Sequence, residues 1–105
     1  MTTEFVIALY HPKPGRDEEL EALVRAHTQL LRSRGLITSR EAVLLRARGG
    51  ALLEIFEWVS PAAVDEAHAD EEVQHIWRRL ADVAEFGQLA SLEEAHLSFP
   101  HFTAV

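Results

Sequence analysis

The sequence contains no cysteine, few basic residues and only five glycines. Without cysteine, the chain has no disulfide, no thiolate nucleophile and no Cys-ligated zinc or iron–sulfur site. Lys and Arg total 10 against 17 Asp and Glu, a formal charge of −7 with no basic cluster. Phosphate backbones and anionic membranes attract clustered Lys and Arg. We therefore expect neither a nucleic-acid nor a membrane partner.

Several longer signals are missing as well. No run approaches the roughly 20 apolar residues of a membrane span, and the first four residues place no positive segment ahead of an apolar one, so we expect no signal peptide. The glycines form no P-loop, no G-x-G-x-x-G and no G-x-S-x-G elbow, which leaves nucleotide chemistry and serine hydrolysis without support. These absences predict a cytoplasmic protein.

The chain is rich in the apolar residues that build a core. Of its 105 residues 48% are hydrophobic, which suits one domain spanning 1–105. Apolar spacing predicts, in order, a strand over 5–10 buried on both faces, a helix over 16–34, strands over 42–47 and 51–59, a helix from 61 to about 83 with a break or new start at 69–72, and a strand over 95–99.

Local signals mark the ends of these elements. Gly49 and Gly50 are a hairpin signal between the two middle strands. Ser60 followed by Pro61 is typical of an N-cap with proline at the first helical position. Gly35 is placed to cap the first helix at its C-terminus.

This element order predicts an α+β fold, a ferredoxin-like βαββαβ arrangement with an antiparallel four-stranded sheet. Two helices cover one face of such a sheet, yet the sequence makes the other face apolar too. An apolar face left in water is unfavourable. We therefore expect a homodimer in which a second copy covers this face, and we leave open whether the tail at 101–105 reaches that copy.

Two stretches of the sequence resemble the antibiotic biosynthesis monooxygenase domain family. One is LEIFEWVSPAAVDEAHADEEV, in which Trp58, Ser60, Ala63, Ala67 and His68 match the family's strand end, Ser and Ala-His pair; the other is the opening LYHPKPGRDEELEALV. Together they cover nearly half the chain. The resemblance implies a dimeric α/β barrel with a small pocket between sheet and helices in each subunit.

The resemblance also implies a choice of functions. Some members of the family oxygenate polycyclic aromatics or quinols without metal or flavin, and others degrade haem. The haem-degrading branch uses a pocket asparagine, and this chain has no asparagine. The favoured expectation is thus a cofactor-independent monooxygenase acting on a small electron-rich aromatic of quinol or anthrone type. The alternative is a non-catalytic dimeric binding protein for a small apolar metabolite.

Two histidines are the candidate catalytic bases. His27 lies on the apolar stripe of the first helix, and His68 belongs to the Ala-His pair. Imidazole titrates near neutral pH and can take a proton from a bound phenol. A buried, hydrogen-bonded structural role is the alternative for either one. The candidate substrate-binding residues are Tyr10, Trp58, Trp77 and His75.

No metal site is expected. His68 and His75 are seven residues apart, whereas two ligands of one metal on a helix are typically four apart. Two acidic residues, Glu54 and Glu57, interrupt an otherwise apolar strand and need partners if buried. We expect Arg46 across the hairpin to pair with them, with a general base as the alternative role.

Overall fold

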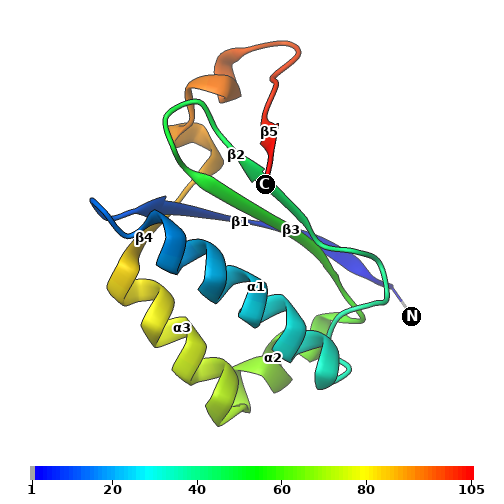
Figure 1. The fold of residues 1–105 in the computed structure, drawn as a ribbon. Coiled ribbons are helices and arrows are strands. Elements are labelled where there is room, and N and C mark those ends of the chain that lie inside the picture. Colours follow the sequence, from blue (N-terminus) through cyan, green and yellow to red (C-terminus); the bar gives the residue numbers. More distant parts are fainter. Residues whose placement is uncertain (1) are drawn as a thin grey trace.

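A computed structural model describes residues 2–105 of the chain. Figure 1 shows one sheet with helices on one side and the C-terminal segment on the other. The strands are β1 (Glu4–Pro12), β2 (Val43–Arg46), β3 (Leu52–Trp58), β4 (Ala84–Gly87) and β5 (Thr103–Ala104). The helices are α1 (Asp17–Ser33), α2 (Pro61–Ala69) and α3 (Glu71–Val83), followed by the short 3-10 turns η1 (Leu89–Ser91) and η2 (Glu93–His96).

The sheet is antiparallel and its strand order is β4-β1-β3-β2-β5. The first four of these strands have the ferredoxin-like order, so the predicted fold class is confirmed. Strand β5 is an addition to the predicted four-stranded sheet. The β2–β3 hairpin turns at the predicted glycines, and Gly50 has a φ of 101° that a residue with a side chain rarely adopts.

Helix α1 forms where the apolar stripe predicted it. Its first turn carries Asp17, Glu18 and Glu19, whose charges stabilise the positive end of the helix dipole. Gly35 follows the helix with a φ of 71°, and Leu36 N–H donates to the carbonyl of Leu31. The predicted C-cap is therefore confirmed.

The second predicted helix is two helices that meet at Asp70. Its backbone is extended, and its carboxylate accepts hydrogen bonds from the N–H groups of Glu72 and Val73 at the start of α3. Arg34, just past α1, pairs with Asp70 at 2.8 Å and with Glu72 at 2.6 Å. The break predicted at 69–72 is thus also a new helix start, and it is tied to the end of α1.

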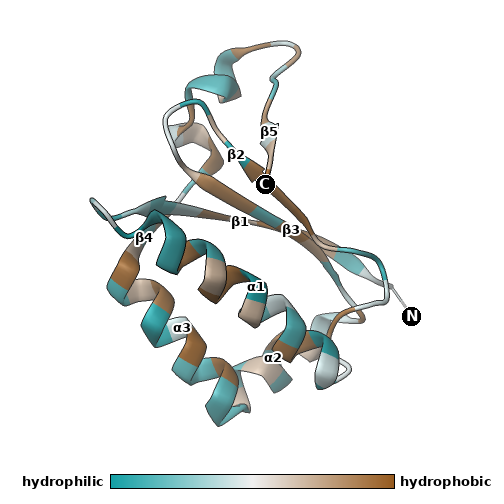
Figure 2. Ribbon diagram, in the orientation of Figure 1, coloured by the Kyte–Doolittle hydropathy of each residue, from teal (hydrophilic) through white to brown (hydrophobic). Residues whose placement is uncertain are grey.

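The helices pack against one face of the sheet, which we call the helix face. Leu52, Phe56 and Trp58 of β3 point to it, as the alternation of the strand predicted. From the helices, Leu20, Val24 and Leu80 pack in one cluster with Leu52 and have almost no exposed surface. Figure 2 shows the matching apolar stripes of α1 and α3 turned toward the sheet.

The opposite side of the sheet, which we call the open face, is covered over only half its length. Leu9 and Leu53 lie under Leu92 and the partly buried Phe102, both from the segment after β4. That segment is anchored by the buried Glu94, which accepts a 2.7 Å hydrogen bond from the N–H of Arg48 at the hairpin. This bond lowers the pKa of the Glu94 carboxyl.

The other half of the open face carries an apolar row across three strands. Ile7 is opposite Ile55, and Ile55 is opposite Val43, so the three side chains stand on the same side. Phe5, Ile7 and Val43 are 62%, 45% and 46% exposed. The expectation that the strand over 5–10 is buried on both faces is wrong for the single chain, because the C-terminal segment does not extend this far.

The last predicted strand is also wrong. Residues 95–99 do not join the sheet; Ala95 lies in η2, and Leu97 and Phe99 are 49% and 85% exposed. The position beside β1 is taken instead by β4, which follows α3 without a loop. The tail pairs with the chain's own β2, through β5 and Val105, and its reach to a partner subunit stays an open question.

We predict that Ser60→Ala loosens the start of α2. The Ser60 hydroxyl accepts a hydrogen bond from the N–H of Ala63, 3.2 Å away. Losing an N-cap side chain costs about 1 kcal/mol of unfolding free energy. Urea unfolding followed by circular dichroism should show this loss, whereas Ser60→Asn, which keeps a capping oxygen, should remain close to wild type. Equal loss in both variants would contradict the cap assignment.

Candidate functional site

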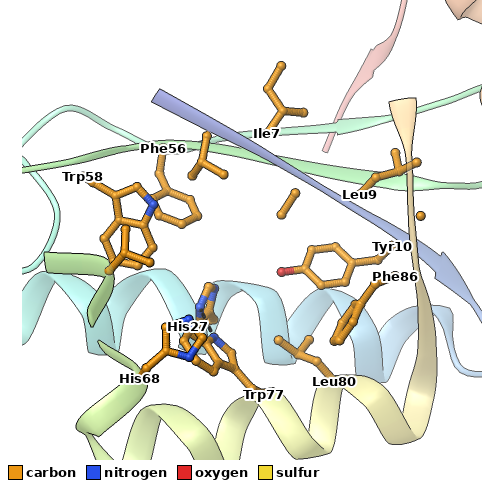
Figure 3. A pocket seen from close by; sticks show the side chains of 14 residues that line it. Ile7, Leu9, Tyr10, His27, Phe56, Trp58, His68, Trp77, Leu80 and Phe86 are labelled. Carbon is orange, nitrogen blue, oxygen red and sulfur yellow. Dashed lines mark hydrogen bonds between the residues drawn. The ribbon is translucent and has the colours of Figure 1, made fainter. Parts of the chain in front are cut away.

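A pocket of about 460 Å³ lies between the helix face and the helices, beside the part of β1 that β4 leaves unpaired. Figure 3 shows Phe56 and Trp58 at one end, Tyr10 and Phe86 at the other, and His27, His68 and Trp77 between them on the helix side. Val6, Ala8, Val64 and Leu80 complete an almost entirely apolar wall. Such a pocket suits a flat, apolar molecule.

The polar groups of the pocket form one buried chain. The carboxylate of Glu54, on β3, has no exposed surface. One of its oxygens is 2.8 Å from Nδ1 of His27 on α1, and the other accepts a 2.6 Å hydrogen bond from the Tyr10 hydroxyl on β1. Trp77 on α3 donates its indole N–H to Nε2 of His27 over 2.9 Å. These four residues connect two strands and two helices.

The Trp77 contact decides where the proton of His27 lies. An indole N–H can only donate, so Nε2 of His27 is the acceptor and carries no proton. The imidazole is then the neutral form protonated at Nδ1, which donates to Glu54. Both oxygens of Glu54 accept hydrogen bonds, as expected for a carboxylate. The chain therefore holds one negative charge beneath an apolar pocket.

The Tyr10 hydroxyl keeps its proton in this environment. Burial raises the pKa of its hydroxyl far above the usual range, and the neighbouring charge and hydrogen bond of Glu54 raise it further. Tyr10 is 4% exposed, and its ring meets Phe86 edge-on with centroids 5.7 Å apart. It is a fixed hydrogen-bond donor to Glu54 rather than a base.

The structure brings together five of the six predicted site residues. His27, Tyr10, Trp58, Trp77 and His68 all line the pocket. His68 is exposed, and its ring packs edge-on against Trp77 with centroids 4.8 Å apart. His75 does not reach this pocket; it lies in a separate hollow on the outer side of α3 with Leu30, Glu71, Glu72 and Ile76.

The prediction that Arg46 pairs with Glu54 and Glu57 is wrong. Arg46 bonds to the carbonyl of Gly50 and lies 3.7 Å from Asp17, so it pairs with neither glutamate. Glu57, on the open face, is held by Thr3, Thr38 and Arg40, and these contacts lower its pKa. Glu54 faces His27 and Tyr10 instead, because the even-numbered residues of β3 point toward the helices.

Phe56 and Phe86 also line the pocket but were not predicted as site residues. Phe56 meets His27 edge-on with centroids 5.8 Å apart, and its alternation with Leu52 was a usable signal. Phe86 had no signal, because the last strand was predicted at 95–99, beyond the end of β4. It stands opposite Tyr10 in the β1–β4 pairing.

The chain is similar to a solved structure, that of Rv0793 from Mycobacterium tuberculosis. The TM-score is 0.66 and the identity 24%, and the match covers 90% of this chain and 99% of that chain. At this identity the likeness shows the fold alone. No protein-family model and no curated protein matches the sequence.

The arrangement can orient a base. A carboxylate on Nδ1–H holds an imidazole in one tautomer and stabilises the imidazolium that forms when Nε2 takes a proton.

Between residues 2 and 105, no group of three or more His, Asp or Glu side chains is placed to hold a metal ion. Over the same residues, no helix has the length and apolar content of a membrane span.

We predict that Tyr10→Phe destabilises the protein in a pH-dependent way. At neutral pH the variant leaves a buried Glu54 oxygen without its donor, which costs about 1–3 kcal/mol. Above about pH 10 an unfolded tyrosine loses its proton while folded Tyr10 keeps it, so the stability supplied by Tyr10 falls as the pH rises.

The measurement is urea unfolding of wild type and Tyr10→Phe from pH 7 to 11. The difference in unfolding free energy should be constant up to about pH 9 and shrink above about pH 10, by up to about 1.4 kcal/mol per pH unit. The difference between the two proteins removes the titration of other groups. A difference that is unchanged at pH 11 would show that Tyr10 ionises normally in the fold.

Proposed function

We propose that this protein binds a small, electron-rich aromatic molecule and promotes its oxygenation by molecular oxygen, with His27 as the base. The observation that carries the proposal is the buried Glu54–His27 pair at the wall of an aromatic pocket. The resemblance of the sequence to antibiotic biosynthesis monooxygenases supports the same reaction. We propose no metal and no flavin.

The pocket residues have separate tasks in this proposal. Trp58, Phe56 and Phe86 offer ring faces and edges on which an aromatic substrate can stack. Glu54 holds His27 in the tautomer whose Nε2 is free of a proton. The apolar walls exclude water, which protects a reactive anion from being quenched.

For an anthrone-type substrate, the oxygenation needs no oxidant other than O₂. His27 removes one proton from the ring CH₂ and leaves a carbanion stabilised by the aromatic system. The carbanion adds to O₂ to give a hydroperoxide anion, which recovers the proton from His27. Loss of water then leaves a ketone, so the carbon is oxidised, one oxygen atom enters the product and the other leaves as water.

We predict that the reaction depends on His27 and not on His75. Oxygen uptake by chelator-treated protein would be measured with anthrones, naphthoquinols and hydroquinones. His27→Gln should lower the rate by about 100-fold or more, the usual contribution of a positioned base. Glu54→Gln should lower it as well, whereas His75→Ala, on the outer side of α3, should leave it unchanged.

A non-catalytic binding protein is the second candidate. The observation that favours it is the contact of Trp77 with Nε2 of His27, which occupies the atom that would act as the base. A pure binder would take up no oxygen above the buffer rate with any member of the panel, while the ligands would still bind. Uptake that survives in His27→Gln would contradict His27 as the base.

We also propose that the protein is a homodimer in which a second copy covers the bare half of the open face. Phe5, Ile7 and Val43 are exposed, and together with the partly buried Ile55 they form a continuous apolar strip. The Arg40 guanidinium lies 5.8 Å from the Phe5 ring centroid and pairs with Glu57 at 2.8 Å beside the strip. A self-complementary apolar strip suits a two-fold interface.

We predict that Val43→Asp dissociates this dimer. Sedimentation equilibrium should give about twice the chain mass of 11.8 kDa for wild type and the single-chain mass for the variant. Leu97→Asp is the matched control, since Leu97 is exposed to a similar degree but lies in the segment after η2. A wild-type protein of single-chain mass at 100 μM would contradict the dimer.

A further inference from the structure

The side chain of Trp77 stands between the pocket and the outside of the protein. It lines the main pocket, and together with His68 it also lines a shallow outer hollow with Gln74, Arg78 and Ala81. The indole is only partly buried, so its outer side has room into which it can turn. Figure 3 shows it beside both histidines.

Trp77 also occupies the acceptor nitrogen of His27. Nδ1 of His27 is engaged with Glu54, and both oxygens of Glu54 already accept hydrogen bonds. Within residues 2–105, the indole N–H is the hydrogen-bond partner of Nε2. A ligand in the pocket that is to bond with His27 must therefore replace this N–H.

The replacement group must itself be a donor. Nε2 carries no proton, so an ether or carbonyl oxygen placed there would meet a lone pair. The carboxylate of Glu54 behind the ring adds a negative charge, which disfavours an anionic group at the same position. A neutral hydroxyl on an aromatic ring satisfies both requirements.

We propose that Trp77 is a specificity-determining residue that gives up its place on His27 Nε2 to a hydroxyl group of the aromatic ligand. In this role Trp77 keeps Nε2 satisfied in the absence of a ligand, and its competition with the ligand hydroxyl sets how strongly hydroxylated rings are preferred over their ethers. The inference rests on the proposed function for the identity of the pocket and its aromatic ligand. It names a requirement that the oxygenation proposal does not contain.

The probes are 1-naphthol and its methyl ether, 1-methoxynaphthalene, which differ at the donor alone. Their affinities for wild type and for Trp77→Phe would be measured by calorimetry. In wild type the hydroxyl gains one hydrogen bond and displaces another, so the two probes should bind within about 2-fold of each other. In Trp77→Phe the acceptor is open, and 1-naphthol should bind about 2- to 10-fold tighter than the ether, the value of one net hydrogen bond.

The indole N–H signal of Trp77 provides a second measurement that needs no change at Trp77. The chain has two tryptophans, so a ¹⁵N spectrum of Trp58→Phe contains the Trp77 indole signal alone. Adding 1-naphthol should shift this signal as the bond to His27 breaks, and adding 1-methoxynaphthalene should leave the bond in place. This measurement does not depend on whether Trp77→Phe folds, because Trp77 is unchanged in Trp58→Phe.

The outcomes separate this inference from the proposed function. An unmoved indole signal at saturating 1-naphthol, equal probe ratios in both proteins, or no binding of 1-naphthol up to 1 mM would each overturn the role of Trp77. Displacement of the indole without oxygen uptake would support Trp77 and contradict the oxygenase. Oxygen uptake with an unmoved indole would do the reverse.

Discussion

The carboxylate of Glu54 is the group around which the helix face is organised. A buried carboxylate is tolerated only where donors surround it, and here the donors come from Tyr10 on β1 and His27 on α1. Trp77 extends the chain to α3 through His27. These bonds can form only when β1 pairs with β3 in this register. Helices α1 and α3 must also turn His27 and Trp77 toward the sheet.

The same network gives the pocket its chemical character. Each buried polar side-chain atom of the network has a hydrogen-bond partner. The surrounding walls can therefore be apolar without leaving a polar group unpaired. The carboxylate of Glu54 is held beside a neutral imidazole, whose Nε2 accepts the hydrogen bond of Trp77. Both the proposed base and the proposed preference for a hydroxyl depend on the exchange of this one bond for a bond to the ligand.

The two faces of the sheet are covered to different extents. The helices cover the helix face, where the pocket lies, whereas the C-terminal segment covers only the half of the open face near the hairpin. Ile7 and Val43 stay exposed on either side of the partly buried Ile55. An apolar row across three strands that is left in contact with water is typical of an interaction surface.

Periodicity and capping signals determined most of the fold. The stripe of α1, the alternation of β3, the glycine turn and the Ser60-Pro61 helix start are all local, and local patterns survive folding when the tertiary contacts agree with them. The last strand failed because its position depends on competition for the edge of β1. That edge was taken by Ala84–Gly87 directly after α3, which no local pattern in 95–99 could reveal.

The sequence by itself supplied the residue types of the site: an acidic residue in an apolar strand, a histidine on an apolar stripe, and two tryptophans. Only the tertiary structure decided their partners. Glu54 and His27 are 27 residues apart and His27 and Trp77 are 50 apart, so their hydrogen bonds exist only once strand and helices have packed. Geometry likewise moved Arg46 away from Glu54 and His75 away from the pocket, because side-chain direction is fixed by register and helix rotation.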